Sequence, residues 1–555
     1  MAKRSAKRNL PSARKARGQA SVSVSAPAPA LPSGPRPAPA ASTARAVVAA
    51  PSGGGAKLTV RFYCQGIGDC HLLKFTKDDG GDFWMLIDCG IHSSITGGPA
   101  KMGQIVDDIA TLTPRLDVIV LTHEHWDHNS AFFTARDKFK QFTVGEIWLG
   151  WTENPSDPQA RQLDKFKAGA VNALQQANKR LQGLREPGPH LAALQDGLQA
   201  VMGFNFGVQG EKVRDARDAA VNLTSPNNRR YLEPTTPPFS IPGLGKTLRI
   251  YVLGPPRDAA MLGITERPAE MYGIAAAGGW PIATVLGNAL ATEAGALQPG
   301  QDMTAPFNPE DGLDLKSARS RRNRRSDEQA KATAQFLHDY YDGPARLEPA
   351  AKPAGKKRRA ARDSKRTDQK WRRIDQDWLG VSSDLAIQLD DRTNNSSLVL
   401  AFEFLESKRV VLFVGDAQVG NWLSWQNVKW TVDDKTVTGP DLLARTVFYK
   451  VGHHGSQNAT LKQHGLELMK NTDLAAFIPT NAKDALKVKW GAMPFVPILD
   501  DLNTRANKRV VRADDAWLAL PAGNPQFSVP SGAIKALSHD PSGNGLWVQM
   551  DIAVG

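Results

Sequence analysis

The 555-residue sequence contains few cysteines and no long, uninterrupted hydrophobic run. Its three cysteines, Cys64, Cys70 and Cys89, form no CxxC pair, which argues against a disulfide framework or a cysteine zinc finger. We interpret them as reduced core residues of a cytoplasmic protein. The longest uncharged run, 271–292, is interrupted by glycine and proline, so we expect no membrane helix. The basic N-terminus is not followed by the apolar block of a secretory signal.

Acidic residues are absent from residues 1–56, which carry nine Lys or Arg in an Ala-, Pro- and Ser-rich background. This composition buries too little apolar surface to fold, so we predict a disordered basic tail. A second basic segment, 316–373, holds nineteen Lys or Arg against seven acids. The first segment carries +9 and the second +12, so the formal charge of +13 leaves −8 for the rest of the chain. Both segments are candidate contacts for nucleic acid. We expect no membrane partner, and the sequence indicates no protein partner.

The remaining residues, 57–555, are predicted to form one large domain with two insertions. The first insertion, 152–245, is predicted to be helical, with two helices within 156–203, because its apolar residues recur at three- and four-residue steps. The second, 259–390, is mixed and basic. Apolar or alternating runs predict strands on either side of the insertions, at 58–64, 71–89, 116–122, 144–151, 246–256, 396–417 and 446–452.

The segment LTHEHWDHNS places four ligand-type side chains directly after the buried strand predicted at 116–122. Imidazoles at His123 and His125 can converge on one cation, and Asp127 with His128 can hold a second cation beside it. Placing these polar and ionisable side chains so close together would cost free energy if no metal were bound. A polar loop that happens to be rich in histidine is the alternative interpretation.

Other short segments occur in an order that resembles the metallo-β-lactamase superfamily, whose metal loop has the HxHxDH pattern. Within that superfamily, the chain most resembles the metallo-hydrolase domain of bacterial DNA-internalisation (ComEC-type) proteins and their soluble relatives. The segments that carry this resemblance are YCQGIGDC, MLIDCG, NNSSLVL, LFVGDA and KVGHHGS. The resemblance covers about 58–150, 246–256 and 391–500. It implies an αββα sandwich, Asp88 as a carboxylate that orients the metal loop, and Asp416 as a bridge between two metals.

One departure from the family pattern concerns the metal bound by His123 and His125. Many members have a separate histidine between HxHxDH and the bridging aspartate, but here that interval contains only His190 and His338, both in the predicted insertions. The segment that contains Asn394 stands there instead. The His123–His125 end of the site is therefore expected either to bind its metal more weakly or to have water as an additional ligand. The number of bound metals stays open.

The HHGS segment offers two adjacent histidines, His453 and His454. Adjacent side chains leaving a strand point in opposite directions, so we expect one metal ligand and one group that contacts substrate or protonates the leaving group. We favour His454 as the ligand because it precedes the Gly455 turn. Ser456 could add a hydrogen-bond donor at the same edge. Two surface histidines on a loop are the alternative.

Three further features have ordinary explanations. The QGIGDC segment, with Asp69, is more typical of a tight turn near the metal rim than of a phosphate loop, because no lysine or helix follows it. Cys70 and Cys89 are more typical of small buried residues than of nucleophiles. Trp126, between the ligands, is interpreted as a packing residue.

The expected site therefore has one set of metal ligands and one set of supporting residues. The predicted ligands are His123, His125, Asp127, His128, Asp416 and His454, and the predicted supporting or substrate-edge residues are Asp69, Asp88, Asn394 and Ser456. We expect one or two zinc ions, with manganese as an alternative. A bound dication lowers the pKa of water toward about 7, and Asp127 would position the resulting hydroxide.

The function predicted from these features is a metal-dependent hydrolase, foremost a phosphodiesterase or nuclease. A hydrolase of a small ester, lactone or thioester is a second hypothesis, favoured by the acidic remainder of the chain. A non-enzymatic module in which the metal is structural is a third, and the complete ligand set speaks against it.

Overall fold

The computed structural model describes residues 57–183, 189–203, 213–264, 379, 381–488, 490–520 and 533–554, together with 267, 286, 318 and 328–337. All of these lie within Gly55–Gly555, one of the two units into which the chain divides. The predicted tail, 1–56, lies outside the described residues. So does the basic segment 316–373, apart from Ala318 and Glu328–Leu337.

The first sheet has eight strands in the order β15-β16-β1-β2-β3-β4-β5-β6. β1, β2 and β3 pair antiparallel, whereas β3 to β6 pair in parallel, so several strands deliver their carboxyl ends to the same edge. The strands are β1 Lys57–Tyr63, β2 Cys70–Thr76, β3 Asp82–Cys89, β4 Arg115–Leu121, β5 Thr143–Gly150, β6 Arg229–Leu232, β15 Ile534–His539 and β16 Trp547–Ala553.

The second sheet has six strands in the order β14-β13-β12-β9-β8-β7. β8 and β9 form the antiparallel hairpin predicted within 396–417, and β9, β12, β13 and β14 run parallel. The strands are β7 Leu248–Gly254, β8 Val399–Phe404, β9 Val410–Phe413, β12 Thr446–Lys450, β13 Ala475–Ile478 and β14 Val510–Arg512. A separate hairpin consists of β10 Lys429–Val432 and β11 Lys435–Thr438.

Apolar side chains from both sheets form the core between them. Phe62 of β1 stacks on Phe477 of β13 and on Phe448 of β12, with ring centroids 4.1 and 5.5 Å apart, and Val118 of β4 belongs to the same buried cluster. Since side chains alternate along a strand, the neighbouring residue Ile119 points to the other face. The sheets therefore face one another.

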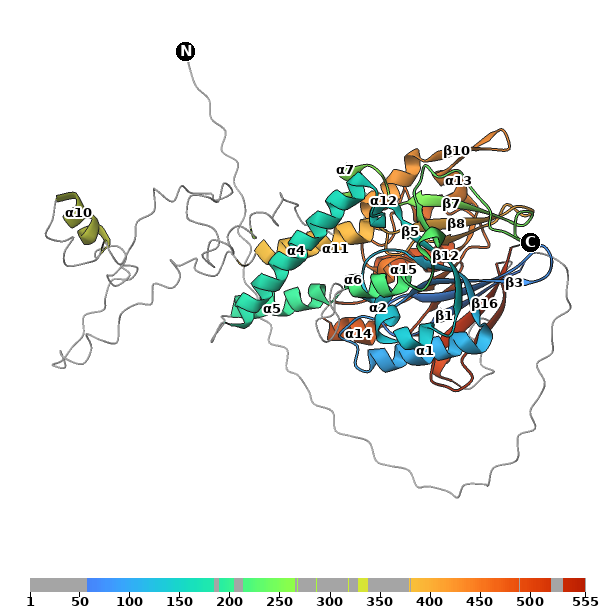
Figure 1. Ribbon diagram of the computed structural model, residues 1–555, viewed down its shortest axis with the longest axis horizontal. Helices are drawn as coiled ribbons and strands as arrows, with labels where there is room; N and C mark the ends of the chain where they lie inside the picture. The colour runs from blue at the N-terminus through green and yellow to red at the C-terminus, as the bar shows by residue number, and fades with distance from the viewer. Residues whose placement is uncertain are drawn as a thin grey trace, which may run out of the picture. The chain divides into compact units, whose positions relative to one another are not determined.

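Helices cover the outer faces of the two sheets. Ile119 packs among residues of α1 and α2 on the first sheet, and Leu412 packs with Trp422 of α12 on the second. The predicted αββα sandwich is thereby confirmed (Figure 1). The main helices on these faces are α1 Gly98–Leu112, α2 Trp126–Thr134, α3 Arg136–Phe139, α7 Ala259–Leu262, α12 Val419–Ser424, α13 Gly439–Ala444 and α15 Val496–Arg505. Helix α14, Ala482–Lys487, packs in a separate small cluster with Ile67.

The first insertion contains the predicted helices, α4 Pro158–Gln182 and α5 Pro189–Met202, followed by α6 Val213–Val221. One face of α4 is buried against α5 and against α11, Val381–Asn395, which belongs to the second insertion (Figure 1). A further described helix of that insertion is α10, Glu328–Leu337. No described helix is long and apolar enough to cross a membrane.

Two parts of the first sheet differ from the prediction. β6 lies within 152–245, the insertion predicted to be helical, and pairs with the edge strand β5. Its four residues, RRYL, have no apolar alternation that would indicate a strand. β16, near the end of the chain, pairs antiparallel with β1, with Ile552 opposite Leu58. Sequence reasoning placed this segment in no element.

The three cysteines are buried and free, as the core interpretation predicts. Cys70 and Cys89 face each other across β2 and β3 with their sulfur atoms 3.3 Å apart. Burial raises the pKa of the Cys64 thiol to about 12, which suits an unreactive packing residue.

The inter-sheet aromatic cluster should dominate stability. Phe62→Ala is expected to lower the free energy of unfolding by about 3–5 kcal/mol, because it opens a cavity between the sheets. Leu486→Ala, at a side chain that is 63% exposed, is the control and should change it by less than about 0.5 kcal/mol. Guanidinium unfolding measures both values. Similar losses in the two variants would contradict this account of the core.

Candidate metal centre

The loops that carry the predicted ligands follow strands of both sheets. HxHxDH follows β4 and runs into the first turn of α2, Asp416 follows β9, and His454 follows β12. β9 and β12 are parallel neighbours, so their carboxyl ends lie at the same edge. The topology therefore brings distant parts of the sequence to one place.

Four of the predicted ligands converge in the protein interior. The ligand atoms of Asp127, His128, Asp416 and His454 all lie within 4.8 Å of one another, and all four residues are buried. His454 Nε2 is 3.0 Å from Asp127 Oδ2, and His128 Nε2 is 3.2 Å from Asp416 Oδ2. Two imidazoles with two carboxylates are a donor set that zinc and similar dications accept.

The hydrogen bonding of this group fits a metal ion. Among the described residues, His128 Nε2, Asp416 Oδ2 and Asp127 Oδ1 are buried and make no hydrogen bond. Buried polar atoms rarely lack partners, because leaving them so is costly. Burial would raise the pKa of the Asp416 carboxyl, but His128 and His454 hold that pKa well below its usual range, so Asp416 is ionised. The residues therefore fit a cation.

His123 and His125 form a pair beside this group. His123 Nε2 and His125 Nδ1 lie 3.0 Å apart, and both rings are buried. Burial lowers the pKa of His123 well below its usual range and that of His125 to about 3, so both rings are neutral, the form that binds metals. Among the described residues, neither His123 nor His125 belongs to a group of three or more converging ligand atoms, in keeping with the sequence departure.

The Asp88 carboxylate is hydrogen-bonded to residues of the metal loop. Its Oδ1 accepts a hydrogen bond from the Thr122 backbone at 2.8 Å, and its Oδ2 accepts one from the Thr122 hydroxyl at 2.6 Å. The same Oδ2 lies 2.8 Å from His128 Nδ1. Asp88 has a φ of 55°, a conformation that non-glycine residues adopt at a cost and that often occurs at functional sites.

Asp69 makes a buried ion pair with Lys450, the last residue of β12. Burial opposes ionisation of Asp69, but Lys450 holds the pKa of its carboxyl well below the usual range. Lys450 also donates to the Gly415 carbonyl at 3.0 Å and lies 3.7 Å from Asp416 Oδ1. Sequence reasoning missed Lys450, although a lysine at the end of an apolar strand, just before HHGS, signals a buried counter-charge.

The other possible donor group consists of Asp69, Asp88 and His128, and most of its atoms have partners, although Asp69 Oδ1 makes no hydrogen bond with any described residue. Asp69 is neutralised by Lys450, and Asp88 is bonded to Thr122 and His128. The group that contains Asp416 is therefore the stronger candidate for a metal site.

Two glycines allow the QGIGDC turn to pack against the metal loop. A Cβ atom at Gly68, whose φ is +138°, would lie 2.7 Å from the Asp127 carbonyl oxygen, and one at Gly90 would lie 2.4 Å from it. The backbone amide of Asp69 donates to that same carbonyl at 3.1 Å. The turn therefore holds Asp127, as the tight-turn interpretation predicts.

The two adjacent histidines lie in a short turn, His453–Gly455, rather than on an extended strand. The prediction that strand alternation points their side chains in opposite directions is therefore wrong. Both have positive φ, 44° and 51°. His454 points its Nε2 at Asp127, whereas His453 Nδ1 lies 2.6 Å from Ser456 Oγ. The geometry places His454 in the metal group and His453 beside it.

Asn394 is fully buried at the end of α11. Its amide nitrogen donates to Asp390 Oδ2 at 3.1 Å and lies 3.5 Å from His453 Nε2. Asp390 Oδ1 lies 3.7 Å from His125 Nε2. Sequence reasoning missed Asp390, because it lies in an insertion and in no recognisable motif.

A buried charge cluster ties the first insertion to the metal loop. Glu124, between the two paired histidines, lies 3.6 Å from Lys167 of α4 and 3.4 Å from Arg217 of α6. Glu153 contacts the same two cations at 3.3 and 2.9 Å. Burial opposes ionisation of Glu153, but Lys167 and Arg217 lower its pKa to about 2.

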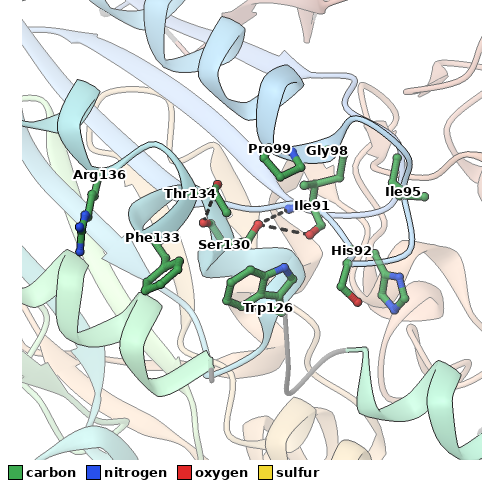
Figure 2. A pocket seen from close by; sticks show the side chains of 11 residues that line it. Ile91, His92, Ile95, Gly98, Pro99, Trp126, Ser130, Phe133, Thr134 and Arg136 are labelled. Carbon is green, nitrogen blue, oxygen red and sulfur yellow. Dashed lines mark hydrogen bonds between the residues drawn. The ribbon is translucent and has the colours of Figure 1, made fainter. Parts of the chain in front are cut away.

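A cavity of about 330 Å³ lies next to the metal loop on the outer side of α2 (Figure 2). Figure 2 shows the rings of Trp126, Phe133 and His92 around it, with Ser130 bonded to the backbone of Ile91. Trp126 is 3% exposed, which supports the packing role predicted for it. The remaining lining residues are Ser93, Ile95, Gly98, Pro99, Thr134 and Arg136.

The family comparison agrees with this geometry. Residues 65–190 match the family model of the metallo-beta-lactamase superfamily. Members of this superfamily are generally metal-dependent hydrolases, so the match supports that class of activity. It ends within α5, and the structure alone places Asp416 and His454 beside the matched loop. No curated protein matches the chain.

The ion pairs of Glu153 should make stability depend on acid pH. Because its folded-state pKa of about 2 lies below the ordinary 4.5, the carboxylate stabilises the fold above about pH 4.5, and this contribution disappears toward pH 2. Glu153→Gln should lower the free energy of unfolding at pH 7 by about 3 kcal/mol. The difference from wild type should shrink as the pH falls, as urea unfolding at several pH values would show.

Asp137→Asn is the control, because Asp137 is an exposed carboxylate that pairs only with Lys140 among the described residues. This variant should resemble wild type throughout. A Glu153→Gln effect of constant size between pH 7 and pH 3 would show that the charge of Glu153 is not what stabilises the fold.

Proposed function

We propose that this protein is a metal-dependent phosphodiesterase or nuclease of the ComEC-like kind. The observation that carries the proposal is the convergence of Asp127, His128, Asp416 and His454 within 4.8 Å, beside the pair His123 and His125. This arrangement offers donors for one or two dications at a buried site.

A zinc or manganese ion held there would act as a Lewis acid and lower the pKa of a water molecule toward neutrality. Asp127 Oδ1, which makes no hydrogen bond with other described residues, can accept one from the attacking water. Burial lowers the pKa of His453, so its ring is neutral at pH 7. His453 Nδ1 lies 3.1 Å from the Gln418 amide nitrogen and 3.2 Å from Asn458 Oδ1, which hold the ring at the edge of the metal group, where it can contact substrate.

The two basic segments support an anionic substrate. A cavity of about 210 Å³ lies against the metal loop, but its cations Lys167 and Arg214 each lie 3.6 Å from Glu124, so the cavity itself does not select an anion. The basic segments 1–56 and 316–373 add a polyanion-binding composition, although almost all of their residues lie outside the described part of the chain. Paired metals suit phosphodiester cleavage, because they stabilise both the attacking and the leaving oxygen.

Hydrolysis of a small ester, lactone or thioester is the second candidate. The 330 Å³ cavity favours it, because aromatic and aliphatic side chains form much of its wall and could receive an apolar acyl group. The acidic remainder of the chain also suits a substrate that is not a polyanion.

A substrate screen separates these candidates. Purified protein with Zn²⁺ or Mn²⁺ is expected to cleave single-stranded DNA, RNA or a chromogenic phosphodiester faster than a chromogenic ester. Asp416→Ala should lower kcat at least about 100-fold, because losing a metal-bridging group should cost more than the 10- to 100-fold typical of a residue behind the ligands. Asp137→Ala makes the same change at an exposed site and should have no effect. Full activity of protein stripped of metal by a chelator would refute the proposal.

The two adjacent histidines should give different phenotypes. His454→Ala should lower bound metal, measured by elemental analysis, together with kcat. His453→Ala should leave bound metal unchanged and lower kcat alone, by about 100-fold or more. His464→Ala, outside the site, is the control. Equal metal loss in the two variants would disprove this division of roles.

A further inference from the structure

Three of the four histidines of the metal centre have one ring nitrogen at an oxygen that can fix the ring. His128 Nδ1 is 2.8 Å from Asp88 Oδ2, and His454 Nδ1 is 2.8 Å from the Pro479 carbonyl oxygen. His123 Nδ1 is 3.0 Å from the Thr122 hydroxyl. Metal-binding histidines almost always have such a partner, which sets the tautomer and leaves the other nitrogen for the metal.

The His125 ring is turned the other way round from the other three rings. Its Nδ1 is the nitrogen that faces His123 Nε2, at 3.0 Å, so Nδ1 is the atom that shares a metal with His123. Its Nε2 therefore needs the orienting oxygen. The carboxylate nearest to that atom is Asp390, whose Oδ1 lies 3.7 Å from it.

The surroundings of Asp390 suit this role. Its Oδ2 accepts a hydrogen bond from the Asn394 amide at 3.1 Å, whereas its Oδ1 makes none with any described residue. One oxygen is thus fixed by the last turn of α11, and the other faces the His125 ring.

We propose that Asp390 is the positioning residue of the His123–His125 metal subsite: when metal is bound there, the 3.7 Å separation shortens and Asp390 Oδ1 accepts a hydrogen bond from His125 Nε2–H, which keeps Nδ1 available for the metal. The inference rests on the proposed metal-dependent function. Asp390 is not a direct ligand in this assignment, because the His125 nitrogen nearest to it is the one that faces away from His123. A residue of the second insertion thereby becomes part of the metal centre.

The test measures metal binding in the full chain, without any substrate. Wild-type protein titrated with Co²⁺ against a competing chelator is expected to bind two equivalents. In Asp390→Asn the weaker equivalent should bind about 10- to 100-fold less tightly, with the Co²⁺ visible spectrum of that site altered. The tighter equivalent and the total bound at saturating Co²⁺ should not change. Asp137→Asn makes the same change at an exposed carboxylate paired with Lys140 and should match wild type.

Asp390→Glu separates charge from packing. It keeps a carboxylate, so its affinity for the second equivalent should stay within about tenfold of wild type and above that of Asp390→Asn. Circular dichroism and thermal unfolding of each variant check the fold first. Asp390→Ser, another neutral hydrogen-bonding side chain, replaces Asp390→Asn if that variant does not fold.

Four outcomes would overturn the inference. Unchanged affinity in Asp390→Asn would remove the role, and equal weakening in Asp390→Asn and Asp390→Glu would reduce it to packing. Loss of one whole equivalent at saturating Co²⁺ would make Asp390 a ligand instead. A single equivalent in wild type would mean that His123 and His125 bind no metal, while the proposed function survives. Wild-type protein that binds no metal at all would instead refute the proposed function itself.

Discussion

The imidazole of His128 joins the two halves of the sandwich at the site. Its Nδ1 meets Asp88 at the end of β3, in the first sheet, and its Nε2 faces Asp416 after β9, in the second. Both carboxylates are buried, and together with Asp69 they raise the pKa of His128 well above its usual range against the opposing effect of burial. Positive charge at this point, from a proton or a metal, compensates the carboxylates that the two sheets bring together.

The insertions contribute directly to the environment of the metal loop. Helices α4 and α6 supply Lys167 and Arg217, which neutralise Glu124 between the two paired histidines. Helix α11, which spans the end of the second insertion, supplies Asp390 beside His125 and Asn394 beside His453. Because buried charges of this kind must be paired to be tolerated, the insertions and the metal loop depend on each other for their arrangement. Variation in the insertions would therefore alter the centre without changing a ligand.

Sequence reasoning predicted those parts of the site and fold that local patterns encode. HxHxDH lies within six residues after an apolar strand, and the β8–β9 hairpin has clear apolar runs, so both were recognisable. Asp390 and Lys450 were not, because each gains its meaning from a partner far away in the sequence. The positions of β6 and β16 at the sheet edges likewise depend on long-range pairing rather than on their own composition.

The pairing of β16 with β1 has a consequence for biosynthesis. β1 is the first described strand, and β15 and β16 follow every other described strand in the sequence, so the sheet that supports HxHxDH is completed only once the residues up to Ala553 have been translated. Until then one side of β1 presents unpaired backbone groups, a surface that favours wrong pairing with other chains. The HxHxDH loop of the nascent protein therefore extends from an incomplete sheet until β16 has been made. A chain released before that point would expose the unpaired edge of β1, which favours aggregation.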